Sequence, residues 1–217
     1  MKNNLSLLVF VMDRSGSMSG IIDETIKGFN SLIEDQKKEE KNGLEAKVTL
    51  AIFDEKYDLI HNYIDIKNIP ELTTELFFAR EWTALHDAIG KTIVDVGKAL
   101  KDLPEEERPA KVLFTVFTDG EENTSKEYLN KISGMIKHQE DKYNWKFNFI
   151  GANIDSYKVG SSLGVSLANT ANYTATSTGV KNMMKDVSNF YSASRSVDPN
   201  IMVGTLDSYM VEDNDAI

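Results

Sequence analysis

The sequence has no cysteine and only three histidines, the residues that bind most zinc ions in proteins. The absence of cysteine excludes disulfide bonds and thiolate metal sites, and it is compatible with any cellular compartment. The histidines, His61, His86 and His138, do not have the spacing of metal ligands, so we expect them at the surface. A thiolate or multi-histidine metal site is therefore not expected.

Long apolar runs and an excess of positive charge are missing as well. No apolar segment approaches the roughly 20 residues that a membrane-spanning helix needs. Lysine and arginine number 24 against 34 aspartate and glutamate residues, a formal net charge of -10. We therefore expect neither a nucleic acid nor an anionic membrane as partner. The apolar run over 5–12 lacks a signal-peptide cleavage site, so we interpret it as a buried strand and expect a soluble, cytoplasmic protein.

The sequence does contain a regular alternation of apolar runs and amphipathic stretches. Continuous apolar runs predict strands, and apolar residues at three- and four-residue steps predict helices. The predicted strands cover 5–12, 46–53, 57–66, 111–118, 145–150 and 171–174. The predicted helices cover 18–41, 83–100, 128–136, 156–163 and 180–191, the last capped by Thr176 or Ser177. This order predicts an α/β fold of the doubly wound, Rossmann-like type, with a mostly parallel central sheet and helices on both faces.

One pair of predicted strands departs from the parallel arrangement. The connection over 54–56 is so short that it permits only an antiparallel hairpin. Its second strand is the more polar one, so we expect it at the sheet edge. The chain is long enough for one sizeable core, and we expect one domain over 1–194 followed by a C-terminal tail of uncertain order over 195–217.

The first predicted strand ends in a cluster of oxygen-bearing side chains. Asp13, Ser15 and Ser17 occupy alternate positions after the apolar run, and Gly16 and Gly20 allow a tight turn there. In open α/β sheets, ligands bind outside the carboxyl ends of the strands. Carboxylate and hydroxyl oxygens suit Mg²⁺, Mn²⁺ or Ca²⁺ rather than zinc.

Two more oxygen-bearing residues fall where the predicted topology brings them to the same edge. Thr83 is the predicted N-cap of the helix that leads to the strand over 111–118, and Asp119 ends that strand. Because this strand should neighbour the first, we expect five side chains to converge around one divalent cation and to leave a position for water or an incoming ligand. These are Asp13, Ser15, Ser17, Thr83 and Asp119.

The runs Asp13-Arg14-Ser15-Gly16-Ser17-Met18 and Thr118-Asp119-Gly120, together with Thr83, resemble the metal-ion-dependent adhesion site of von Willebrand factor type A domains. The resemblance covers the motif and the order of elements over 5–194, and it points to bacterial or phage cytoplasmic members. It implies that the serines and the threonine coordinate the ion directly, while the aspartates hold coordinated waters or, for Asp119, exchange into direct contact. It also implies a protein partner that presents a Glu or Asp to the ion, and no catalysis.

The sequence departs from the family pattern just before the threonine. Family members often have a glycine there, whereas this chain reads Arg80-Glu81-Trp82-Thr83. Trp82 is either an exposed aromatic contact for a partner or a ring folded back onto the sheet edge. We interpret Glu121 and Glu122 as complements of a helix dipole, and Asp87 as an acid in the first turn of a helix that needs no further function.

Two enzyme activities are alternatives to a binding module as interpretations of this sequence. The run Gly160-Ser161-Ser162-Leu163-Gly164 has the spacing of a hydrolase nucleophile elbow, but no strand is predicted before it. Magnesium-dependent phosphoryl transfer at Asp13 would need a second carboxylate and a cationic side chain on the phosphate, a role in which Arg14 is the candidate. Phosphoryl transfer and a structural assembly subunit with a vestigial site remain the alternatives.

Overall fold

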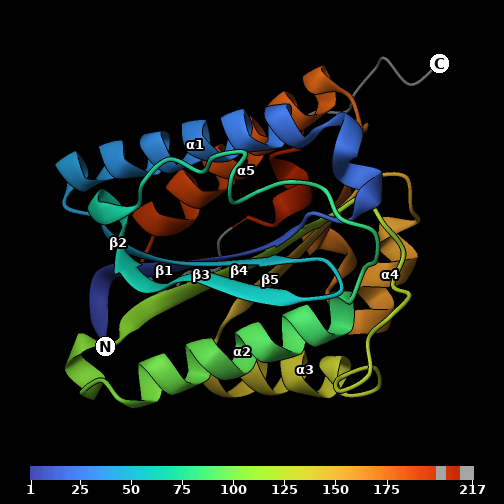
Figure 1. Cartoon of the computed structure of the whole chain (residues 1–217). Helices are drawn as coiled ribbons and strands as arrows, with labels where there is room; N and C mark the ends of the chain where they lie inside the picture. The colour runs from blue at the N-terminus through green and yellow to red at the C-terminus, as the bar shows by residue number, and fades with distance from the viewer. Residues whose placement is uncertain (199–203, 211–217) are drawn as a thin grey trace.

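A six-stranded sheet forms the centre of the computed structural model, which describes residues 1–198 and 204–210 (Figure 1). Its strands are β1 (Lys2–Asp13), β2 (Glu45–Phe53), β3 (Tyr57–Asp65), β4 (Pro109–Thr118), β5 (Lys146–Gly151) and β6 (Thr170–Asn172). The spatial order is β3-β2-β1-β4-β5-β6, and every neighbouring pair is parallel except β2 and β3. This confirms the predicted α/β sheet with one antiparallel edge strand.

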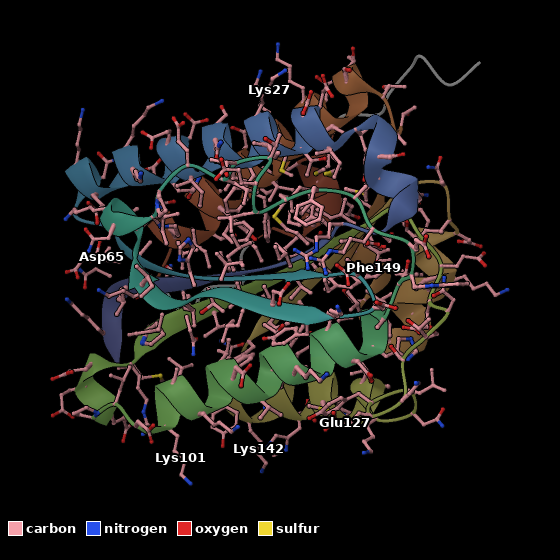
Figure 2. All side chains as sticks on the ribbon, in the orientation of Figure 1. Lys27, Asp65, Lys101, Glu127, Lys142 and Phe149 are labelled. Carbon is pink, nitrogen blue, oxygen red and sulfur yellow. The ribbon has the colours of Figure 1, made fainter. Side chains whose placement is uncertain are left out.

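Helices cover both faces of the sheet, as predicted (Figure 1). They are α1 (Ile22–Lys38), α2 (Leu85–Lys101), α3 (Ile132–Tyr143), α4 (Ser156–Leu163) and α5 (Ser177–Ser196). Helices α1 and α5 pack on one face, while α2, α3 and α4 pack on the other. Figure 2 shows Phe149 of β5 inside these layers, whereas Lys27, Lys101 and Lys142 point outward from their helices.

Strand β1 supplies both cores, because successive side chains of a strand point to opposite faces. Leu8, Phe10 and Met12 pack against α1 and α5. The residues between them, which include Val9 and Val11, pack under α2 and α3. A strand buried on both faces must be apolar throughout, which explains the unbroken run that precedes Asp13.

Three helices begin later than the sequence predicts. Helix α1 begins at Ile22 instead of residue 18, because residues 16–20 form a short 3-10 helix. Helix α2 begins at Leu85 with Ala84 at the N-cap position, so the prediction that Thr83 caps it is wrong. Helix α3 begins at Ile132 instead of residue 128. The reason is a tertiary contact: the Asp87 carboxylate accepts the backbone N–H groups of residues 126–128 at 2.9 to 3.0 Å, which holds them in a loop.

The predicted tail is described only in part. Residues 199–203 and 211–217 lie outside the described residues. Helix α5 extends to Ser196, and the segment 204–210 returns to the core, where Leu206 is fully buried. The ring of Tyr209 packs edge-on against Phe190 of α5, with centroids 5.7 Å apart. Within the described ranges, no helix combines the length and apolar character that a bilayer span requires.

Candidate metal centre

The parallel pairing of β1 and β4 brings the predicted site residues together. Asp13 ends β1 and Asp119 follows β4, whose Phe117 lies opposite Met12. Ser15 and Ser17 lie in the turn after β1, where residues 16–20 form a short 3-10 helix. Thr83 enters from the segment that precedes α2. Three separate parts of the chain therefore meet at one edge of the sheet.

The three hydroxyl groups surround a single point beside Gly120. A Cβ atom added to Gly120 would lie 3.2 Å from Ser17 Oγ, 3.2 Å from Thr83 Oγ1 and 3.3 Å from Ser15 Oγ. The two serine hydroxyls are 3.2 Å apart. Because Gly120 has no side chain, the backbone can pass close to these oxygens without filling the space between them.

Both aspartates are buried at this point, but they differ in their hydrogen bonds. Asp13 accepts the Ser15 backbone N–H at 2.6 Å on one oxygen and the Thr118 hydroxyl at 2.5 Å on the other. Asp119 accepts the Ser17 hydroxyl at 2.5 Å through Oδ1. Its Oδ2 is buried and has no hydrogen-bond partner within the described residues. A buried carboxylate oxygen without a partner is costly unless a cation or water satisfies it.

The pKa values of Asp13 and Asp119 indicate that the two carboxylates lack a compensating positive charge. Burial raises the pKa of Asp13 from 3.8 to about 6, although hydrogen bonds from Thr118 and Ser15 oppose the shift and the nearby Asp119 charge adds to it. Burial also raises the pKa of Asp119, against the hydrogen bond from Ser17. Two carboxylates and three hydroxyls form a hard, all-oxygen donor set that fits a divalent cation.

Arg14 lies between the site residues in sequence, yet its side chain is only 3% exposed and binds other residues. Its Nε donates to Asp54 at 2.7 Å, one terminal nitrogen donates to Asp58 at 2.5 Å, and the other donates to the Leu76 carbonyl at 3.2 Å. Its backbone N–H donates to Phe53 O at 2.8 Å. Arg14 therefore binds the turn after β1 to the β2–β3 hairpin. With its guanidinium paired in this way, Arg14 is not available to bind a phosphate.

Asp54 is a structural member of this site, although the sequence pattern predicts it only as part of a turn. It is fully buried, and its carboxylate pairs with Arg14 and, at 3.5 Å, with Arg80. Its backbone carbonyl accepts the Ala84 N–H at 2.9 Å, next to Thr83. The signal that could have identified it is its position, because Asp54 follows an apolar strand in the same way as Asp13 and Asp119.

Thr83 is held through its backbone, which leaves its hydroxyl free for the cluster. Its N–H donates to Asn123 Oδ1 at 3.0 Å, and its carbonyl accepts the N–H groups of Asn123 and Thr124 at 3.1 and 3.3 Å. Nothing in the sequence pattern identified Asn123. Trp82, the preceding residue, has 51% of its surface exposed, which favours the interpretation as an exposed aromatic residue.

Glu122 complements a helix other than the one expected. Its carboxylate accepts the N–H of His86 at 2.9 Å, in the first turn of α2, and those of Thr124 and Ser125.

The run 160–164 lies at the end of α4, where the exposed Ser162 hydroxyl donates to Val159 O at 2.7 Å. A nucleophile elbow needs a strand-to-helix turn, so the hydrolase interpretation is wrong on this geometry.

Comparison with known proteins supports the fold. No protein-family model matches the sequence, and no curated protein matches it either. The pilus adhesin SpaC from Lactobacillus rhamnosus GG matches with 12% identity and a TM-score of 0.66 over 89% of this chain and 30% of its own. The proximal thread matrix protein 1 of the mussel byssus, with a zinc-occupied MIDAS motif, matches with 13% identity and a TM-score of 0.57 over 88% and 46%.

A von Willebrand factor type A protein from Catenulispora acidiphila matches with 11% identity and a TM-score of 0.56, over 88% of this chain and 43% of its own. The chain thus spans less than half the length of each of these three structures. At such low identity the likeness concerns the fold. The chain has the α/β fold of von Willebrand factor type A domains.

Proposed function

We propose that this protein is a metal-dependent protein-binding module. In this proposal Ser15, Ser17 and Thr83 bind a divalent cation through their hydroxyls, with Asp13 and Asp119 beside them, and a Glu or Asp of a partner protein completes the coordination. The observation that carries the proposal is the meeting of three hydroxyls around one point, next to a buried carboxylate oxygen that lacks a partner.

The donor set suits this role because hydroxyl ligands carry no charge. A cation held largely by neutral oxygens keeps positive charge that attracts an external carboxylate. Ser17 is exposed, so the cluster is open to solvent on that side. We propose Mg²⁺, with Mn²⁺ and Ca²⁺ as alternatives, on the all-oxygen chemistry. Zinc belongs in any titration, since it occupies the MIDAS motif of the mussel protein.

We also propose that the module has no enzymatic activity of its own. Phosphoryl transfer needs a free cationic side chain at the metal. The candidate, Arg14, is bound to Asp54 and Asp58. Two of the similar structures are named as a pilus adhesin and a thread matrix protein, and a further one, 14% identical with a TM-score of 0.58 over 88% of this chain and 62% of its own, is the PilB minor pilin from Streptococcus sanguinis. The cytoplasmic location remains a prediction, since two of these are pilus proteins.

Metal titration tests the proposal directly. Metal-free protein should bind Mg²⁺ or Mn²⁺ in a calorimetric titration, and Ser17→Ala or Thr83→Ala should weaken binding by at least about tenfold while the fold is retained. Ser162→Ala is the matched control, because that hydroxyl lies on an exposed helix. Equal affinities for the parent and Ser17→Ala would contradict the proposal.

A second experiment addresses the partner. Affinity purification from the native cell should recover a protein in the presence of Mg²⁺ and lose it with a chelator or in Ser17→Ala. A partner that is retained under both treatments favours the structural-subunit alternative. Magnesium-dependent turnover of a phosphate ester, lost in Asp13→Asn, favours phosphoryl transfer.

A further inference from the structure

A hollow lies beside the candidate metal centre, on the side of α1. Its volume is about 280 Å³. One wall comes from residues 19–24, at the end of the turn that carries Ser17 and the start of α1, and the other comes from residues 74–79. Ser19 and Gly20, which line it, are two and three positions from Ser17. The hollow is therefore lined by part of the same turn that carries Ser17.

The segment that follows the wall 74–79 is held against the turn that carries Ser15 and Ser17. The Arg80 N–H donates to Arg14 O at 2.9 Å. The Arg80 carbonyl lies 3.0 Å from the position of a Cβ atom added to Gly16. The segment before Thr83 thus packs directly against the turn that holds Ser15 and Ser17.

The lining combines an apolar floor with two carboxylates. Phe77 is fully buried, Phe78 has 42% of its surface exposed, and Ile22 is half-buried. Asp23 and Glu24 lie on the same wall as Ile22, in the first turn of α1 and across the hollow from Phe77 and Phe78. Neither forms an ion pair with any residue of the ranges 1–198 and 204–210.

We propose that the metal and this hollow form one docking surface, occupied by a segment of a partner protein in which a Lys or Arg stands a few residues from the carboxylate that binds the metal. This inference rests on the proposed function. A basic side chain fits both features, because its aliphatic stem can lie on Phe78 and Ile22 while its charged end reaches Asp23 and Glu24.

Charge also selects this occupant over others. The chain carries a formal net charge of -10, which repels a partner that presents only acidic residues. An apolar side chain in the hollow would bury Asp23 and Glu24 against a surface that cannot pair with them. A basic residue beside the acidic one removes both penalties and speeds association through complementary charge.

Selection of peptides tests the inference. A phage-displayed library of random linear peptides is bound to the full chain in Mg²⁺ and eluted with EDTA, so that only metal-dependent binders are recovered. We expect a Lys or Arg near the acidic residue of the selected peptides. We also expect the double variant Asp23→Asn, Glu24→Gln to bind them about tenfold more weakly and with a shallower salt dependence.

The matched control is Glu105→Gln, Glu106→Gln, which removes the same charge from exposed positions before the amino end of β4. It should leave peptide affinity within twofold of the parent. Unchanged affinity in the Asp23, Glu24 variant, or no enrichment of basic residues over the unselected library, would overturn the docking surface. In either case, peptides released by EDTA and lost in Ser17→Ala would leave the metal-binding module standing. Recovery of no EDTA-eluted peptide contradicts the module itself, and the docking surface with it.

Discussion

At the residue scale, Asp13 shows how burial and hydrogen bonding compete at the base of the metal centre. Its two oxygens are already bound by Ser15 and Thr118, which orients the carboxylate. Burial nevertheless raises its pKa to about 6, because a buried carboxylate loses the hydration of its charge, and the nearby Asp119 charge adds a smaller effect in the same direction. In the proposed function, a proton on Asp13 therefore competes with the bound cation.

The raised pKa of Asp13 makes the stability of the protein depend on pH in a defined direction. The folded protein holds the Asp13 proton more tightly than the unfolded chain does, so metal-free protein loses about 3 kcal/mol as pH rises from about 4 through about 6. Urea unfolding in EDTA at pH 4.5 and pH 7 should reveal this loss, and Mg²⁺ should stabilise more at pH 7 than at pH 5. Asp13→Asn should remove this contribution from the slope; an unchanged slope in that variant speaks against the assignment.

Gly120 is the residue whose lack of a side chain keeps the space between the three hydroxyls open. In Gly120→Ala the new Cβ would lie 3.2 to 3.3 Å from the oxygens of Ser15, Ser17 and Thr83. We expect Mg²⁺ affinity to fall at least about tenfold, with a loss of stability of at most about 2 kcal/mol. Gly97→Ala in α2, where a Cβ meets nothing within 4 Å, is the control. Normal Mg²⁺ binding by Gly120→Ala in calorimetry would place the ion elsewhere.

The buried ion pair of Arg14 and Asp54 positions two of the three segments that form the site. Asp54→Asn leaves the Arg14 charge with only Asp58 and the Leu76 carbonyl, and we expect a loss of about 3 kcal/mol in urea unfolding. Asp58→Asn is the comparison, because its side chain is 46% exposed and its pairing should contribute at most about 1 kcal/mol. Equal losses in the two variants would contradict this account of Arg14.

At the scale of secondary-structure elements, the end of the sheet opposite the metal centre is closed by α5. Lys111, near the start of β4, donates to the carbonyls of Ser194 and Arg195 at 2.8 and 2.9 Å and also to that of Val197. Arg195 in turn donates to the carbonyl of Gln36 in α1 at 2.8 Å. These contacts bind the last turn of α5, whose carbonyls have no helical partner, to β4 and α1.

Removing Lys111 should therefore loosen α5 without affecting metal binding. Lys111→Met leaves these carbonyls without a donor, and we expect a loss of about 2 kcal/mol together with faster amide exchange in the last turn of α5. Mg²⁺ affinity should be unchanged, because Lys111 and Asp119 lie at opposite ends of β4. Lys101→Met is the control, since that side chain points into solvent (Figure 2). A large loss of Mg²⁺ affinity in Lys111→Met would contradict this separation.

At the scale of the whole molecule, the fold is shared with proteins whose sequences differ almost everywhere. The four similar structures described above are 11 to 14% identical, yet their TM-scores lie between 0.56 and 0.66. The layered arrangement needs only apolar strands and one apolar face on each helix, a pattern that many sequences satisfy. The residues of the site select the partner, whereas the fold is common to proteins with different functions.

The sequence by itself determined the sheet, its antiparallel edge and the meeting of Asp13 with Asp119. Apolar periodicity marks each strand, the length of a connection decides whether two strands are antiparallel, and strands joined through a helix lie parallel with their carboxyl ends at one edge. Each of these signals lies within a short stretch of sequence. Only the tertiary structure decided that Arg14 turns to Asp54, that Asn123 holds Thr83, and that residues 126–128 stay out of α3. Each of these contacts joins residues about 40 positions apart. No periodicity encodes such pairs, since they depend on which side chains the packed loops place within hydrogen-bond reach.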